Sequence, residues 1–154
     1  MLCAASAGQA AGLSCSADQC IERINQVAAK TNQGLVSAKQ NCTEGDGFTR
    51  CYYRSSMGPG ISQITKAGSQ NVQAIVIVDR RGLSPAGGVY ISVIMEALDS
   101  SLNVDARRQF YNQLLQEFAS GFQKGGIIQK SSRELKYVLS TDERFTIFSV
   151  SPAN

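Results

Sequence analysis

Residues 42–51 read Cys-Thr-Glu-Gly-Asp-Gly-Phe-Thr-Arg-Cys, and this stretch predicts a β-hairpin closed by a disulfide. The dipeptide Asp46-Gly47 favours a two-residue type I′ turn, in which both central residues have positive φ angles. Such a turn places Cys42 opposite Cys51 in a non-hydrogen-bonded pair, whose Cα atoms lie about 4.5 Å apart. A disulfide accepts that separation. We therefore expect a Cys42–Cys51 bond and an oxidising compartment, so that the protein is periplasmic or secreted.

The other cysteines leave several arrangements open. The simplest partner for Cys15 is Cys20, but both could instead bond to Cys42 and Cys51, because four cysteines allow three connectivities. The spacings between these four match no common zinc motif, so we expect a disulfide framework and no metal site. Cys3 is left over, and we expect it to be free, lipid-modified or lost with a leader.

Length and composition predict one folded domain. The chain has 154 residues, 43% hydrophobic and 18% charged, which is ordinary for a globular protein. Its net charge of +3 is too small to predict a nucleic-acid partner, and no apolar run approaches the ~20 residues of a transmembrane helix. We assign residues 15–154 to a single domain. Residues 1–14 are either a flexible N-terminus or a signal remnant, since Ala5-Ser6-Ala7 has the small-x-small pattern of a signal-peptidase site.

Hydrophobic periodicity predicts three helices, at 16–31, 85–102 and 103–124. Alternating or β-branched runs predict strands at 35–43, 48–55, 72–78, 135–139 and 145–150, with a weaker signal at 61–67. The run at 72–78, VQAIVIV, is the most hydrophobic and predicts a buried central strand. Because the strands come in blocks, we expect an α+β fold with an antiparallel sheet of about five strands and three helices, in the order α-β-β-(β)-β-α-α-β-β.

The sequence contains no histidine, which removes the commonest general base and the commonest metal ligand. Three carboxylate pairs remain as candidates for catalysis: Glu44 with Asp46, Glu96 with Asp99, and Asp142 with Glu143. A catalytic pair needs one desolvated member with a raised pKa. We expect all three pairs to be solvated, and therefore no enzyme, no catalytic residues and no cofactor.

The segment after the hydrophobic run has the outline of an anion site. Arg80 and Arg81 precede a helix start at Ser84-Pro85, with Gly87 and Gly88 in its first turn. Amides at a helix N-terminus and paired arginines both bind phosphate or carboxylate groups. The segment matches neither of the usual phosphate-binding motifs, and its two glycines are also explained by close packing of the helix on the sheet.

A more specific surface lies on the hairpin. The expected register places Lys39, Phe48, Arg50, Tyr52 and Arg54 on one side, with Lys39 opposite Arg54. Like charges in such a pair lower stability and would gain from an acidic partner. Tyrosine and arginine are also enriched in binding hot spots. We interpret these five residues as a partner-binding surface, against the simpler alternative of a solvated sheet face.

These patterns favour an exported, non-enzymatic protein that binds a macromolecular partner. We expect that partner to be another protein with acidic groups, as for an inhibitor, an immunity protein or an accessory subunit of an envelope assembly. The alternative is a small-molecule or anion-binding domain that uses Arg80 and Arg81. The oligomeric state stays open, and the apolar helices and edge strands are compatible with a homodimer.

Overall fold

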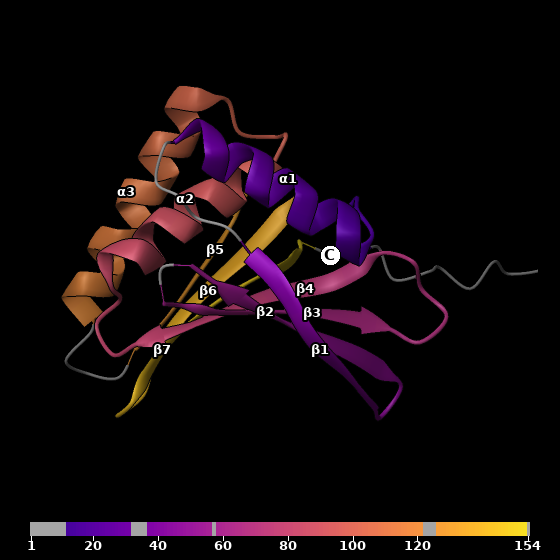
Figure 1. Ribbon diagram of the computed structural model, residues 1–154. Coiled ribbons are helices and arrows are strands. Elements are labelled where there is room, and N and C mark those ends of the chain that lie inside the picture. The colour runs from indigo at the N-terminus through magenta and orange to yellow at the C-terminus, as the bar shows by residue number, and fades with distance from the viewer. Residues whose placement is uncertain (1–11, 32–36, 57, 122–125, 154) are drawn as a thin grey trace, which may run out of the picture.

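The computed structural model describes residues 12–31, 37–56, 58–121 and 126–153 (Figure 1). Cys3 and the parts of predicted elements at 35–36 and 122–124 lie outside the described residues. The elements, in chain order, are α1 (Ala17–Lys30), β1 (Ser37–Gly45), β2 (Phe48–Ser55), β3 (Gly60–Lys66), β4 (Val72–Arg80), α2 (Pro85–Leu98), α3 (Val104–Gly121), β5 (Ile127–Ser131), β6 (Leu135–Thr141) and β7 (Phe145–Pro152).

The described strands form one seven-stranded antiparallel sheet in the spatial order β1-β2-β3-β4-β7-β6-β5. The prediction of about five strands is therefore wrong. The weak signal at 61–67 belongs to a full strand, β3, which pairs with both β2 and β4. β5 was not predicted at all, because its sequence IIQKS is short and half polar and gives little periodic signal.

All three helices lie on the same face of the sheet (Figure 1). α2 lies between the other two and contacts both of them, while α3 also contacts β5 at the sheet edge. The middle position explains why α2 is apolar around most of its circumference, with Tyr90, Ile91 and Ile94 fully buried.

The core fills the space between the helices and the sheet. On β4 and β7 it takes every second residue, including Ile75, Ile77, Phe148 and Val150, and each of these side chains is almost completely buried. Burying one such side chain stabilises the fold by about 1.5–3 kcal/mol. Tyr137 on β6 joins the cluster, with its ring centroid 6.1 Å from that of Phe148.

A buried disulfide joins Cys15 to Cys20 at the start of α1, with their Cα atoms 5.3 Å apart. Between them, Ser16 caps the helix and exchanges capping-box hydrogen bonds with Gln19. The backbone carbonyl of Cys15 also accepts a hydrogen bond from the amide of Val72 at 3.0 Å. The start of α1 is therefore attached to the first residue of β4.

The predicted hairpin turn and the pairing of its cysteines are confirmed. Asp46 and Gly47 have φ angles of 50° and 78°, as a type I′ turn requires. Cys42 lies opposite Cys51 and forms the second disulfide, with a Cα–Cα distance of 4.0 Å. Cys51 is buried under the helices, whereas Cys42 is exposed on the edge strand β1.

The register changes farther along the same hairpin. A β-bulge between Lys39 and Asn41 adds Gln40 to β1, so that Ala38, not Lys39, lies opposite Arg54. The predicted Lys39–Arg54 pair is therefore wrong. Lys39 instead lies opposite Tyr53, on the side of the sheet that carries the helices.

Replacing Cys42 and Cys51 with serine should lower the free energy of unfolding by about 2–3 kcal/mol, because the bond closes a short loop in the unfolded chain. We also expect β1 amides to exchange with solvent faster, since eight of the nine residues of β1 are exposed and little burial holds this strand in place. Denaturant titration and hydrogen exchange measure the two effects.

The matched control replaces Cys15 and Cys20 with serine. That variant should lose stability but keep the protection of the β1 amides relative to the rest of the sheet. If the β1 amides exchanged at the wild-type rate in the variant without Cys42 and Cys51, the Cys42–Cys51 bond would not be what holds β1 in place.

Candidate binding face

The three helices leave one face of the sheet uncovered (Figure 1), here called the open face. This face carries most of the predicted hairpin surface. On β2 the side chains of Phe48, Arg50, Tyr52 and Arg54 point to this face, alternating with Cys51 and Tyr53 on the helix side. Phe48 and Tyr52 keep 45% and 38% of their surfaces exposed, which is high for large apolar side chains. The structure thus brings four of the five predicted residues together and leaves out Lys39.

The two arginines on β2 carry charge that no described residue neutralises. Arg50 lies opposite Ile64 and Arg54 opposite Gly60, and neither guanidinium forms a hydrogen bond or ion pair within the described part of the chain. Both side chains are exposed. Their donors remain available to a carboxylate from another molecule, which a guanidinium can bind through two parallel hydrogen bonds.

A hollow of about 580 Å³ lies beside the hairpin turn. Phe48, Arg50 and Tyr52 line it from β2, Ile64 lines it from β3, and Ala74 lines it from β4. Glu44 and Asp46 line its outer end, next to the turn. The hollow therefore has an apolar floor with one cation and two carboxylates around it, and it can receive an apolar side chain of a partner.

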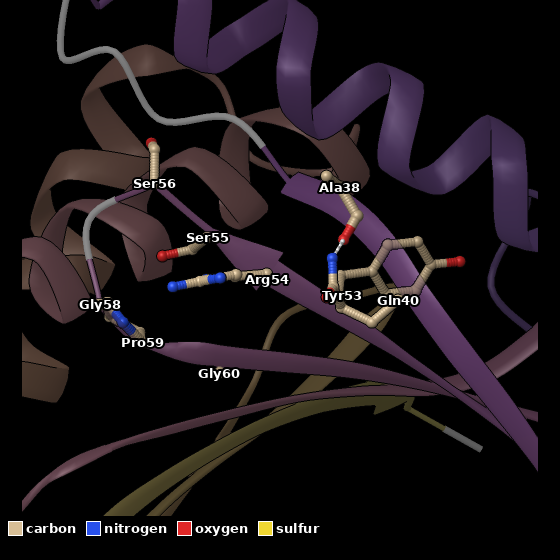
Figure 2. Close-up of a pocket in the computed structure, with 9 residues that line it drawn as sticks. All are labelled: Ala38, Gln40, Tyr53, Arg54, Ser55, Ser56, Gly58, Pro59 and Gly60. Carbon is tan, nitrogen blue, oxygen red and sulfur yellow. Dashed lines mark hydrogen bonds between the residues drawn. The ribbon is translucent and has the colours of Figure 1, made fainter.

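A second hollow, of about 810 Å³, lies at the opposite end of β2 (Figure 2). Its described lining residues are Ala38, Gln40, Tyr53, Arg54, Ser55, Ser56, Gly58, Pro59 and Gly60. Figure 2 shows the side chain of Arg54 extended toward the turn that contains Gly58 and Pro59. Arg54 is the one lining residue with a permanent charge among these, so the hollow favours an anionic group.

Tyr53 lines this second hollow with an uncharged side chain, which has a structural role. It is 4% exposed, and its hydroxyl donates a hydrogen bond to Oε1 of Gln63 at 3.1 Å. Burial raises the pKa of the Tyr53 hydroxyl, and the negative charge of Asp18 raises it further. The hydroxyl is therefore neutral at physiological pH and holds the inner side of β2 against β3.

At the predicted anion site near Arg80 and Arg81, the start of α2 is already capped by groups of the chain itself. The carboxylate of Asp79 accepts hydrogen bonds from the amide of Ser84 at 2.7 Å and from its hydroxyl at 2.6 Å, so it occupies the start of α2. The amide of Gly87 donates to Oγ of Ser84 at 3.0 Å. An external anion would meet the charge of Asp79 at this position. We therefore do not place the binding site at this loop.

Gly87 has a packing role that the sequence could only suggest. A Cβ atom at this position would collide with the Asp79 carboxylate and would lie 2.8 Å from Cδ1 of Leu83. The missing side chain lets the first turn of α2 approach the end of β4. Gly88 is less tightly placed, since a Cβ there would lie 3.2 Å from the hydroxyl of Tyr111.

Asp99 is the exception among the predicted carboxylate pairs. The other members are exposed as expected, but Asp99 is only 2% exposed, so the prediction of a solvated residue is wrong. Its Oδ2 accepts a hydrogen bond from the Tyr137 hydroxyl at 2.5 Å, and its Oδ1 accepts two from Ser101. Burial, with the hydrogen bond and charge of Asp99, raises the pKa of Tyr137 far above its usual value. Both oxygens of Asp99 are occupied, which indicates a structural carboxylate at the end of α2.

The open face also extends beyond the hairpin, which the sequence does not reveal. Lys66 from β3, Arg80 from β4 and Lys136 from β6 lie at positions that point the same way as Arg50. Alternation within 135–141 separates Lys136 from Tyr137, but it does not say which of the two shares a face with the hairpin. That information comes only from the spatial order of the strands.

No family model, curated protein or solved structure matches the chain. Among the described residues, no cluster of three or more His, Cys, Asp or Glu side chains is arranged to hold a metal ion. Within the same ranges, no helix combines the length and the apolar character needed to cross a lipid bilayer.

Changing Gly87 to alanine should lower the free energy of unfolding by about 1–3 kcal/mol, because the new methyl group would push Asp79 away from Ser84. Gly45→Ala is the matched control, since a Cβ at residue 45 meets no atom within 4 Å. Thermal denaturation of both variants measures the difference. Equal stability of the two variants would contradict the close packing of α2 on β4.

Proposed function

We propose that the protein is an exported, non-enzymatic protein that binds a macromolecular partner through the β2 part of the open face. One observation carries this proposal: Phe48, Arg50, Tyr52 and Arg54 share an uncovered face, and neither arginine forms an ion pair with an acidic side chain among the described residues. An inhibitor, an immunity protein or an accessory subunit of an envelope assembly would use a surface of this kind.

Export is supported by the two disulfides. Cys42 is exposed, so a reducing cytoplasm would have access to the Cys42–Cys51 bond, whereas an oxidising compartment would preserve it. A structural disulfide on an exposed strand is therefore most useful outside the cytoplasm. The lack of histidine and the structural role of Asp99 both favour binding over catalysis.

Binding would combine two effects on the same strand. Phe48 and Tyr52 supply apolar surface that is already exposed before the partner arrives. Arg50 and Arg54 attract acidic groups, which raises the rate of association and selects the orientation of the partner. Because β2 pairs with β1 and β3, these four side chains are held at fixed positions along one strand.

Changing Arg50 and Arg54 to glutamate should weaken partner binding about tenfold or more at low salt, because two attractive charges become repulsive. The partner is captured from the periplasmic or secreted fraction with the wild-type protein, purified, and titrated by isothermal calorimetry at several salt concentrations. The wild-type affinity should fall as salt rises, and that of the variant should depend on salt much less.

The control variant carries Lys30→Glu and Arg108→Glu, which change the charge equally on the helical layer. It should bind like the wild type. Equal affinity of all three proteins for the purified partner would remove β2 from consideration as the binding site.

The export component has a separate test. Protein purified from its native source under thiol-trapping conditions should yield, after digestion without reductant, a peptide pair joined through Cys42 and Cys51. Mass spectrometry identifies this pair. Detection of both thiols in the free, trapped form would contradict an exported location.

A further inference from the structure

The sheet presents far more uncovered apolar surface than the hairpin alone. The large apolar side chains that stay exposed in the described chain are Phe48, Tyr52, Val78, Val104, Ile127 and Phe145. All except Val104, which lies on α3, occupy open-face positions. A concentration of this kind on one face of a protein is typical of an interaction surface.

Strand pairing shows that these side chains are continuous across the sheet. One row crosses six strands and consists of Arg54, Gly60, Val78, Ile147, Ser140 and Ile127. The next row consists of Tyr52, Ser62, Val76, Ser149, Val138 and Gln129. At the usual strand spacing, each row is about 24 Å long. The middle of the first row is aliphatic, with Val78 beside Ile147, and the second row adds Val76 and Val138 on either side of Ser149.

β4 provides an independent indication that this face becomes covered. Its sequence is apolar on both sides, as in strands that are buried on both faces, yet the helices cover only the side of Ile75 and Ile77. Val76 and Val78 point to the other side, where no described element lies over them (Figure 1). Val78 keeps 36% of its surface exposed.

Every charged strand residue at an open-face position of the described chain is basic, whereas the acidic residues that border this face, Glu44 and Asp46, lie at the hairpin turn. The charged strand residues of the open face among those described are Arg50, Arg54, Lys66, Arg80 and Lys136. No acidic strand residue points this way, since Glu44 and Asp79 lie at helix-side positions. None of the five basic side chains forms a hydrogen bond or ion pair with a described residue. The cations surround the aliphatic rows from β2, β3, β4 and β6.

We propose that the whole open face, from β2 to β6, is a docking surface for an acidic protein segment with apolar side chains at its centre. This inference builds on the proposed function and names the partner chemistry and the full extent of the site. A second copy of the chain fits poorly, because two open faces would bring like charges together. The aliphatic centre favours a protein over nucleic acid, whose bases are bound chiefly by aromatic stacking.

The test uses a fluorescent random copolymer of glutamate and tyrosine as the probe, with polyglutamate as the probe that lacks apolar groups. The wild-type protein should bind the copolymer more tightly than polyglutamate. The double variant Arg80→Glu with Lys136→Glu should weaken copolymer binding about tenfold, and so should the double variant Arg50→Glu with Arg54→Glu. The variant with Lys30→Glu and Arg108→Glu should leave it unchanged.

The contribution of the aliphatic side chains to binding is tested by the double variant Val76→Ser with Val138→Ser. This variant keeps every charged residue of the open face. This variant should lose the preference for the copolymer over polyglutamate while retaining the affinity for polyglutamate. Circular dichroism and thermal denaturation identify the variants that remain folded. Val138→Ser alone replaces the double variant if the latter unfolds, since β6 lies farther from the sheet centre than β4.

The outcomes separate this inference from the proposed function. Loss of copolymer binding in the β2 variant but not in the Arg80 and Lys136 variant would overturn the extended surface and leave the proposed function standing. No effect of either variant would overturn both. If the protein bound single-stranded DNA or phosphatidylglycerol vesicles more tightly than the copolymer, the choice of a protein partner would be overturned. A homodimer whose association becomes stronger with Arg80→Glu would overturn the choice of an acidic partner as well.

Discussion

The one-sided cover of the sheet is the constraint on which the rest of this structure depends. α1, α2 and α3 all lie on one face, so every second strand residue is buried beneath them (Figure 1). Ile77, Phe148 and Leu139 form one such buried row across β4, β7 and β6. Since apolar burial is the main favourable contribution to folding, this layer defines the stable core. The same arrangement leaves the opposite side chains without cover.

The strands farthest from the core are held by other interactions. β1 has one neighbouring strand and little buried surface, and the Cys42–Cys51 bond fixes it to β2. At the other edge, β5 contacts α3, and Lys130 forms an ion pair with Glu117 on that helix. Each edge strand thus has a link that does not depend on its own hydrophobic content. This is consistent with the weak apolar periodicity of β5, which was not predicted from the sequence.

Local signals in the sequence predicted the local structure well. The turn at Asp46 and Gly47, and the helix start at Ser84-Pro85, each depend on residues within a few positions of one another. The Cys42–Cys51 pair follows directly from the turn, because a two-residue connection determines which residues face each other near it. The prediction failed beyond the bulge at Gln40, since nothing in the sequence of β1 marks the inserted residue.

Features that join distant parts of the chain could not be predicted. Asp99 is buried because Tyr137, 38 residues away, donates a hydrogen bond to it, and no pattern around either residue indicates that contact. The open face is a similar case. Its basic residues come from four strands, and only the order of those strands shows that Arg50 and Lys136 point the same way.

The disulfide and the binding face are physically linked through β2. Arg50 and Tyr52 lie on a strand that is paired on both sides, so their backbone would lose little conformational freedom if the proposed partner bound. That advantage requires β1 to stay in place, because without it β2 would become the exposed edge of the sheet. β1 has few buried contacts of its own, and the Cys42–Cys51 bond supplies the missing attachment. An oxidising compartment would preserve the bond, and it would thereby also keep the proposed binding surface ordered before a partner arrives.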